Sequence, residues 1–167
     1  MIAIALTIAS CQKSGPVTLR QSGHGSAELT SIVYTGDPDA GPQLLKGFFN
    51  IEEYSWRWTA QKFSVVLRPP DGAMGENATL DLSLAIPPYE IERLGAITLR
   101  AAIESSSLGS ETYTKPGHYH FRRDVPASLL THQEVRIDFD LDKSLKPDGD
   151  DTRDLGIIVA SISLEPR

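Results

Sequence analysis

Four stretches of this chain alternate apolar and polar residues with a period of two, and this pattern most constrains the fold. In residues 80–86 every second residue is Leu or Ile, and related patterns occupy residues 62–68, 97–103 and 135–142. Successive side chains of a β-strand point to opposite faces of the sheet, so each stretch would have one apolar and one polar face. The pattern predicts antiparallel sheets with one solvated face.

Clusters of Pro, Gly and Asp separate these stretches. They stand at residues 36–39 (GDPD), 69–72 (PPDG) and 87–88 (PP), and these residue types favour turns. Residues 29–34 and 155–164 add two further apolar strand candidates. Six to eight strands joined by such turns predict an all-β antiparallel β-sandwich of the jelly-roll type, with a β-barrel as the competing architecture.

Helix is expected only as a few short turns. Residues 42–48, 89–94 and 126–130 each allow one or two turns, and two of these segments begin with Pro, which suits the first turn of a helix. The 13 Gly and 11 Pro exceed what a helical bundle tolerates. Residues 29–167 carry neither a repeat nor a linker, and we expect them to form one domain.

The first eleven residues resemble a bacterial lipoprotein signal. An apolar run ends in residues 8–11 (IASC), which match a lipobox and contain the only cysteine, Cys11. The interpretation is a signal in residues 1–11, lipidation of Cys11, and a polar tether in residues 12–28 that holds the protein at the membrane. Because no Lys or Arg precedes the apolar run, the true start lies upstream or the match is accidental and the run is a buried strand.

Charge and cysteine content exclude several classes of protein. The chain has 22 acidic and 16 basic residues, for a formal net charge of −6. A nucleic-acid partner would require a basic excess, so none is expected. With Cys11 as the only thiol, no intrachain disulfide can form.

Three motifs carry a family resemblance. They are residues 47–52 (GFFNIE), residues 56–59 (WRWT) and residues 151–157 (DTRDLGI). Together they resemble a signature of jelly-roll, galactose-binding-like domains in bacterial surface-glycan proteins, and the body is similar to that of uncharacterised single-domain bacterial lipoproteins. The resemblance implies a β-sandwich that binds glycan. Where the family has an Asn-Gly hairpin, residues 105–109 (SSSLG) predict a longer one.

Aromatic residues supply the first candidate for ligand contact. Tyr54, Trp56 and Trp58 are two residues apart, and sugars bind through C–H faces stacked on such rings. On a strand, Trp56 and Trp58 would share one face and Arg57 would point the other way. If their face is inward the two Trp fill the core, and if it is outward they form a stacking platform.

Charged residues supply the second candidate. Glu52, Arg57, Asp151 and Arg153 are expected to meet in a half-buried ion network. One interpretation is structural, because an ion pair of this kind ties the first strands to the last. The other is a polar pocket for sugar hydroxyls. The full set of candidate ligand-binding residues is Glu52, Tyr54, Trp56, Arg57, Trp58, Asp151 and Arg153.

Metal and catalytic motifs are weak. His118 and His120 would share one strand face, but a zinc site needs three or four ligands. In residues 138–149 the sixth and twelfth positions are Lys143 and Gly149, where an EF-hand requires Gly and Glu, which leaves only a loose calcium loop at residues 148–151. No nucleophile elbow or HExxH motif is present. We therefore predict no metal, no cofactor and no catalytic residues.

These observations predict a lipid-anchored protein of the cell envelope, with a non-catalytic β-sandwich that binds glycan or another envelope component. The Gln12 that follows Cys11 favours the outer membrane, by resemblance to lipoprotein sorting rules. The alternative is a structural or interaction lipoprotein that does not bind glycan. A glycan hydrolase is a further alternative and would need two carboxylates converging in a cleft.

Overall fold

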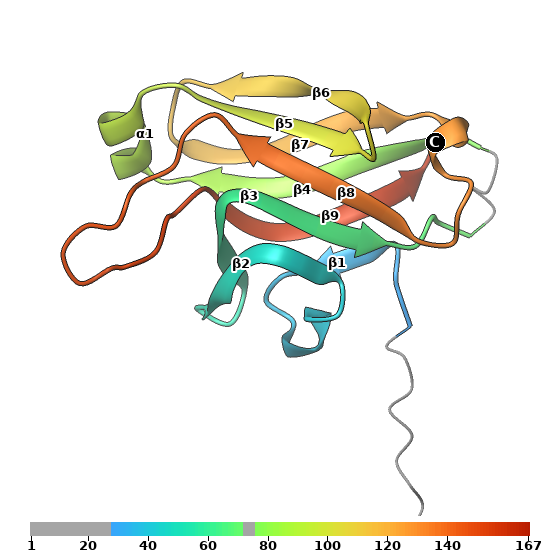
Figure 1. Ribbon diagram of the computed structural model, residues 1–167, viewed down its shortest axis with the longest axis horizontal. Helices are drawn as coiled ribbons and strands as arrows, with labels where there is room; N and C mark the ends of the chain where they lie inside the picture. Colours follow the sequence, from blue (N-terminus) through green and yellow to red (C-terminus); the bar gives the residue numbers. More distant parts are fainter. Residues whose placement is uncertain (1–27, 72–75) are drawn as a thin grey trace, which may run out of the picture.

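The computed structural model describes residues 28–71 and 76–167, so Cys11, the lipobox and residues 12–27 lie outside the described residues. Most of the described chain is β-strand (Figure 1). The strands are β1 (Ile32–Tyr34), β2 (Leu44–Glu52), β3 (Trp56–Leu67), β4 (Ala78–Ile86), β5 (Ile97–Ile103), β6 (Ser106–Tyr113), β7 (Gly117–Val125), β8 (Val135–Leu141) and β9 (Ile158–Pro166).

All strand pairs are antiparallel, and the strands follow the order β6-β5-β8-β3-β9-β4-β7, with β1 added to β9 and β2 added to β3. Strand β3 joins the two layers, because its first residues pair with β9 and residues 62–67 pair with β8. The sheet is nearly closed. The predicted antiparallel β-sandwich is confirmed, and the predicted stretches correspond to β3, β4, β5 and β8.

The alternating side chains of these strands form one hydrophobic core between the layers. Phe63 of β3 stacks on Phe139 of β8 with ring centroids 4.8 Å apart, and Phe48 of β2 meets Phe63 edge-on at 5.4 Å. Leu82 of β4 and Phe121 of β7 close the core from the other layer and are fully buried. Burial of these large side chains supplies the main driving force for folding.

Helix is confined to short segments, as predicted. The α-helix α1 (Pro88–Leu94) and the 3₁₀ turn at Ala127–Leu129 lie where helical turns are expected. The expected turn at residues 42–48 is wrong, because β2 begins at Leu44 and pairs with β3. None of the helices in the described ranges is long and apolar enough to cross a bilayer.

The β5–β6 connection also differs from expectation. Ile103 pairs directly with Ser106, so the hairpin turns through only two residues, and Glu104 takes a left-handed conformation with φ of 53°. The prediction of a longer hairpin is wrong. Strand β6 itself is exposed on both faces over most of its length and therefore lacks the alternating pattern of the other strands.

Gly47 lets β2 approach β3 closely. Its φ is +76°, and a Cβ built on it would lie 2.2 Å from the backbone oxygen of Lys62. A side chain at this position would meet backbone that cannot move without breaking the β2–β3 pairing. Gly41, at the start of the same hairpin arm, has nothing within 4 Å of the equivalent Cβ.

These two glycines make a matched pair for measurement. We expect Gly47→Ala to lower the free energy of unfolding by about 2 kcal/mol or more, from the left-handed backbone and the steric overlap. Gly41→Ala should leave it unchanged or raise it by up to about 1 kcal/mol. Urea unfolding followed by tryptophan fluorescence checks both values. Equal stabilities of the two variants would contradict the close approach at Gly47.

Candidate ligand-binding cleft

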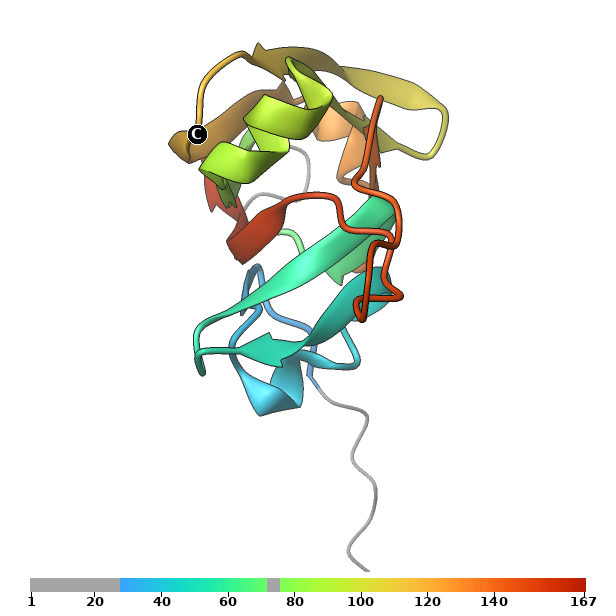
Figure 2. The same ribbon diagram turned by 90° about the vertical axis from the view of Figure 1, so that its left-hand side faces the viewer.

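The long connection between β8 and β9, residues 142–157, folds back on itself beside α1. Leu145 and Leu155 pair through two backbone hydrogen bonds of 2.8 and 2.9 Å. Asp148 and Asp151 pair further out, and Gly149 takes a positive φ at the tip. Figures 1 and 2 show α1 and this connection at the same end of the sandwich. The connection therefore has defined backbone structure and forms one wall of a cleft.

Two sets of contacts fix this wall. The amide of Gly156 donates to the Thr59 carbonyl at 2.6 Å, and a Cβ on Gly156 would lie 2.6 Å from the Ala60 oxygen. On the other side, Lys143 Nζ donates to the carbonyl of Leu94, at the end of α1, at 3.0 Å. The connection is thus attached to β3 at one point and to α1 at another.

A small apolar cluster separate from the main core lies beneath the cleft. Trp58, Leu145 and Leu155 are its buried members. Trp56 meets Trp58 edge-on, with ring centroids 6.1 Å apart, which confirms that the two indoles share a face of β3. Trp58 is only 5% exposed and therefore belongs to the protein interior, whereas Trp56 is half-buried. The pair does not form a fully exposed stacking platform.

Three of the four expected charged residues meet above this cluster. Arg153 Nη1 donates to Glu52 at 2.6 Å and Arg153 Nη2 donates to Asp151 at 2.9 Å. The Arg153 guanidinium also lies 5.6 Å from the centroid of the Phe49 ring, within reach of a cation–π contact. Hydrogen bonds from the side chain and amide of Arg153 lower the pKa of Asp151 to about 2, and the two carboxylates raise the pKa of Arg153.

Arg57 and Tyr54 lie apart from this network. The Arg57 guanidinium donates to the backbone carbonyls of Thr35 at 2.7 Å and Phe49 at 2.9 Å, and its partial burial lowers its pKa. Arg57 therefore has a structural role, because it connects β3 to Thr35, which follows β1, and to β2. Tyr54 is 97% exposed in the β2–β3 turn, where it takes a left-handed conformation.

The cleft between α1 and the β8–β9 connection has a volume of about 220 Å³. Tyr89 and Arg93 of α1 line one side, and Lys146 and Arg153 line the other. Each cation has a carboxylate partner. Arg93 meets Asp148 at 3.0 Å, Lys146 meets Asp154 at 2.9 Å, and Arg153 meets Asp151 as described above. The lining therefore presents donors and acceptors side by side with little net charge.

Tyr89 is the aromatic residue of the cleft that sequence reasoning missed. Its ring is 42% exposed and its centroid lies 6.3 Å from that of Trp58. Partial burial and the nearby carboxylates of Glu90 and Glu52 raise its pKa to about 12, so the hydroxyl keeps its proton at neutral pH. The exposed ring and the protonated hydroxyl are the two features that a sugar contact uses.

Glu90, the next residue of α1, is fully buried behind the cleft wall. Neither carboxyl oxygen has a hydrogen-bond partner among the described residues. Burial raises the pKa of this carboxyl to about 8, because desolvation disfavours the charged form. This raised pKa favours the neutral form at neutral pH, and the carboxyl is enclosed by protein, so it does not supply a second carboxylate to the cleft.

The candidate metal ligands do not converge on one site. His120 Nδ1 lies 2.8 Å from the buried carboxylate of Asp81, which also accepts from Arg122 at 2.7 Å, while His118 points to solvent. In the acidic loop, Asp148 and Asp151 pair with arginines. Within the described ranges, no group of three or more His, Cys, Asp or Glu side chains is arranged to hold a metal ion.

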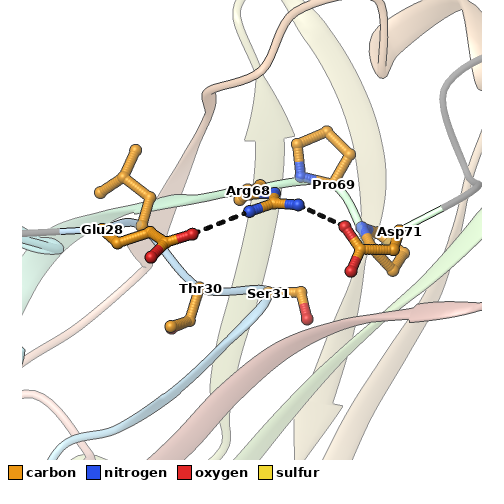
Figure 3. A pocket seen from close by; sticks show the side chains of 8 residues that line it. Glu28, Thr30, Ser31, Arg68, Pro69 and Asp71 are labelled. Atoms are coloured by element: carbon orange, nitrogen blue, oxygen red, sulfur yellow. Dashed lines mark hydrogen bonds and ion pairs between the residues drawn. The ribbon is translucent and has the colours of Figure 1, made fainter.

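A second pocket, of about 270 Å³, lies where the residues before β1 meet those that follow β3 (Figure 3). Arg68, after the end of β3, reaches between the carboxylates of Glu28 and Asp71 and pairs with both. Its charge is therefore fully balanced within the protein.

The buried carboxyl of Glu90 should make the free energy of unfolding depend on pH. The folded protein holds a proton on this carboxyl up to about pH 8, whereas the unfolded chain releases it near the ordinary value of 4.5. Hence the free energy of unfolding falls as pH rises through this window, by on the order of 4 kcal/mol. Glu90→Gln, which keeps a neutral side chain, should remove that fall and be more stable than the parent protein at pH 8.

Urea unfolding at a series of pH values from 4.5 to 8.5 measures the effect. Glu92→Gln, an exposed change on the same helix, is the control and should retain the fall. If the stability difference between the parent protein and Glu90→Gln stays constant over this range, Glu90 is not protonated in the folded state.

The similarity of this chain to known proteins is one of fold. No protein-family model and no curated protein sequence matches the chain. Among solved structures, the family GH115 4-O-methyl-α-glucuronidase BtGH115A, described as specific for decorated arabinogalactans, superposes with a TM-score of 0.54 at 8% identity. The match covers 96% of this chain and 20% of that one, so this chain corresponds to about a fifth of that enzyme's length.

Two carbohydrate-binding modules are also similar, at lower scores. TmCBM27, described in terms of mannan recognition, has a TM-score of 0.46 at 14% identity and covers 84% of this chain and 98% of its own. CBM35 from Paenibacillus barcinonensis has a TM-score of 0.38 at 11% identity, with 84% and 92% covered. At these identities the likeness concerns architecture alone, and the chain has the jelly-roll-like β-sandwich fold that the sequence predicts.

Proposed function

We propose that this chain is a non-catalytic carbohydrate-binding domain whose ligand lies in the cleft between α1 and the β8–β9 connection. The observation that carries the proposal is the position of the Glu52–Arg153–Asp151 network, beside the exposed ring of Tyr89. A sugar presents C–H faces to a ring and hydroxyls to charged groups that are already paired. Its hydroxyls both donate and accept, which matches a lining of adjacent carboxylates and guanidinium groups.

The electrostatics support binding rather than hydrolysis. A glycosidase of the common type needs a carboxyl with a raised pKa to act as the acid and a second carboxylate opposite it. At the cleft, Arg153 lowers the pKa of Asp151, which favours the charged form. Glu90 has the raised pKa, but its carboxyl is enclosed by protein.

Binding can be measured with the full chain and a panel of oligosaccharides, with arabinogalactan fragments included. We expect Arg153→Gln and Tyr89→Ala each to weaken binding about tenfold, through loss of charged hydrogen bonds and of ring contact respectively. Tyr89→Phe keeps the ring and should retain most of the affinity. Isothermal titration calorimetry gives the dissociation constants.

Arg68→Gln is the matched control, because Arg68 also bridges two carboxylates but lies in the other pocket (Figure 3). It should leave glycan affinity unchanged, and circular dichroism should show that all variants remain folded. If no glycan binds, or if Arg153→Gln and Arg68→Gln behave alike, the cleft is not a glycan site.

The burial of Trp58 favours a second candidate, a structural or interaction lipoprotein without glycan binding. In that case the charged network only holds the β8–β9 connection against β2. The glycan panel distinguishes the two candidates, because a purely structural network predicts loss of stability in Arg153→Gln with no saccharide ligand at all.

We also propose that Cys11 anchors the protein at the cell envelope, in the outer membrane of a Gram-negative cell, on the basis of the lipobox in residues 8–11. When the full chain is expressed in such a host with labelled palmitate, the label should enter the protein and the protein should sediment with membranes. Cys11→Ala should abolish both. Mass spectrometry that finds Met1 retained and the thiol unmodified in the native host would contradict the anchor.

A further inference from the structure

A groove of about 310 Å³ lies on the face formed by β5, β8 and β3, and shares no lining residue with the cleft. The strand register builds it. Arg100 of β5 lies opposite Asp140 of β8, which in turn lies opposite Lys62 of β3. In the next row Ala102 lies opposite Asp138. Small side chains therefore lie beside long charged ones, which leaves space between the charges.

The charges of the groove are not balanced. Asp138 is bound by the Arg136 guanidinium through contacts of 2.8 to 3.2 Å, so its charge is compensated. Asp140 has only a distant ion pair, 3.9 Å from Lys62 Nζ. Lys46 of β2 and Arg100 line the groove and make no ion pair with any residue of ranges 28–71 and 76–167.

The charge balance of this groove differs from that of the cleft and of the pocket in Figure 3. In the pocket of Figure 3 a single cation lies between two carboxylates, and in the cleft every cation has its own carboxylate. Here three cations from three strands face two carboxylates of one strand, although the whole chain has a net charge of −6. Local positive charge on an acidic protein favours an anionic ligand.

We propose that this groove is a second ligand site and that it takes a saccharide unit bearing a carboxylate or sulfate group. The Arg100 fork and Lys46 bind the anionic group, because guanidinium geometry matches both groups with paired hydrogen bonds. Asp140 accepts hydrogen bonds from the hydroxyls of the same unit. The saccharide nature of the ligand rests on the proposed function, whereas its anionic group rests on the groove alone.

Calorimetry with the full chain tests the proposal with four probes, which are trigalacturonate, galactotriose, a sulfated galactotriose and inorganic sulfate. At least one acidic trisaccharide should bind about tenfold more tightly than galactotriose, and its affinity should fall with added salt. The two acidic probes distinguish carboxylate from sulfate as the preferred group. Inorganic sulfate should bind more weakly than either, because it has no sugar hydroxyls for Asp140.

The variants assign the site. Arg100→Gln and Lys46→Gln should each weaken acidic trisaccharide binding about five- to tenfold, while Arg68→Gln leaves it unchanged. The proposal would be overturned if acidic and neutral probes bound with equal affinity, or if Arg100→Gln left acidic trisaccharide binding unchanged. Neither result would contradict the proposed function of the cleft. Conversely, acidic binding that depends on Arg100 in a protein whose cleft binds no glycan would support this site and refute the proposed cleft function.

Discussion

Strand β3 hydrogen-bonds to β9 through its first residues and to β8 through its last, and the positions of the other elements depend on this double pairing. One half of the strand places Phe63 in the main core, while the other half places Trp58 in the small cluster under the cleft. Gly47 and Gly156 allow neighbouring backbone to approach β3 closely from β2 and from the β8–β9 connection. The same strand thus links both layers of the sandwich to the cleft.

The cleft, the groove and the pocket of Figure 3 differ in how their charges are paired. Arg68 is neutralised by two acids of the protein, and Arg153 is neutralised but lies beside an exposed ring. Lys46 and Arg100 line a groove in which cations outnumber carboxylates. Exposed ion pairs add little stability, so these arrangements are better judged by what they offer a ligand. Neutral saccharides suit the paired lining, and acidic ones suit the unpaired lining.

Local sequence patterns predicted β4, β5, β8 and the second half of β3, although Ser64 and Val66 of β3, which were expected on a solvated face, are buried. They failed for β2, because the expected helical turn rested on Pro42 at the start of the segment, whereas pairing with β3 and the packing of Phe48 on Phe63 make it a strand. They gave no signal for β6, whose residues are mostly exposed. The contact of Glu52, Asp151 and Arg153 was expected from these charged residues, but with Arg57 wrongly included. Tyr89 and Arg93 of α1 line the same cleft only through the tertiary fold, which no local pattern encodes.

The β8–β9 connection is closed by the Leu145–Leu155 bridge, and no interstrand pairing of the sandwich passes beyond that point. The nine residues between the two leucines therefore lie outside the strand pairing of the sandwich and contact it through side chains, with Arg153 bound to Glu52 of β2 and Asp148 to Arg93 of α1. Variants with tips of other lengths or compositions should keep the same β-sandwich while changing the shape of the cleft mouth. Grafting foreign segments at this position offers a route to new binding specificities on an unchanged framework.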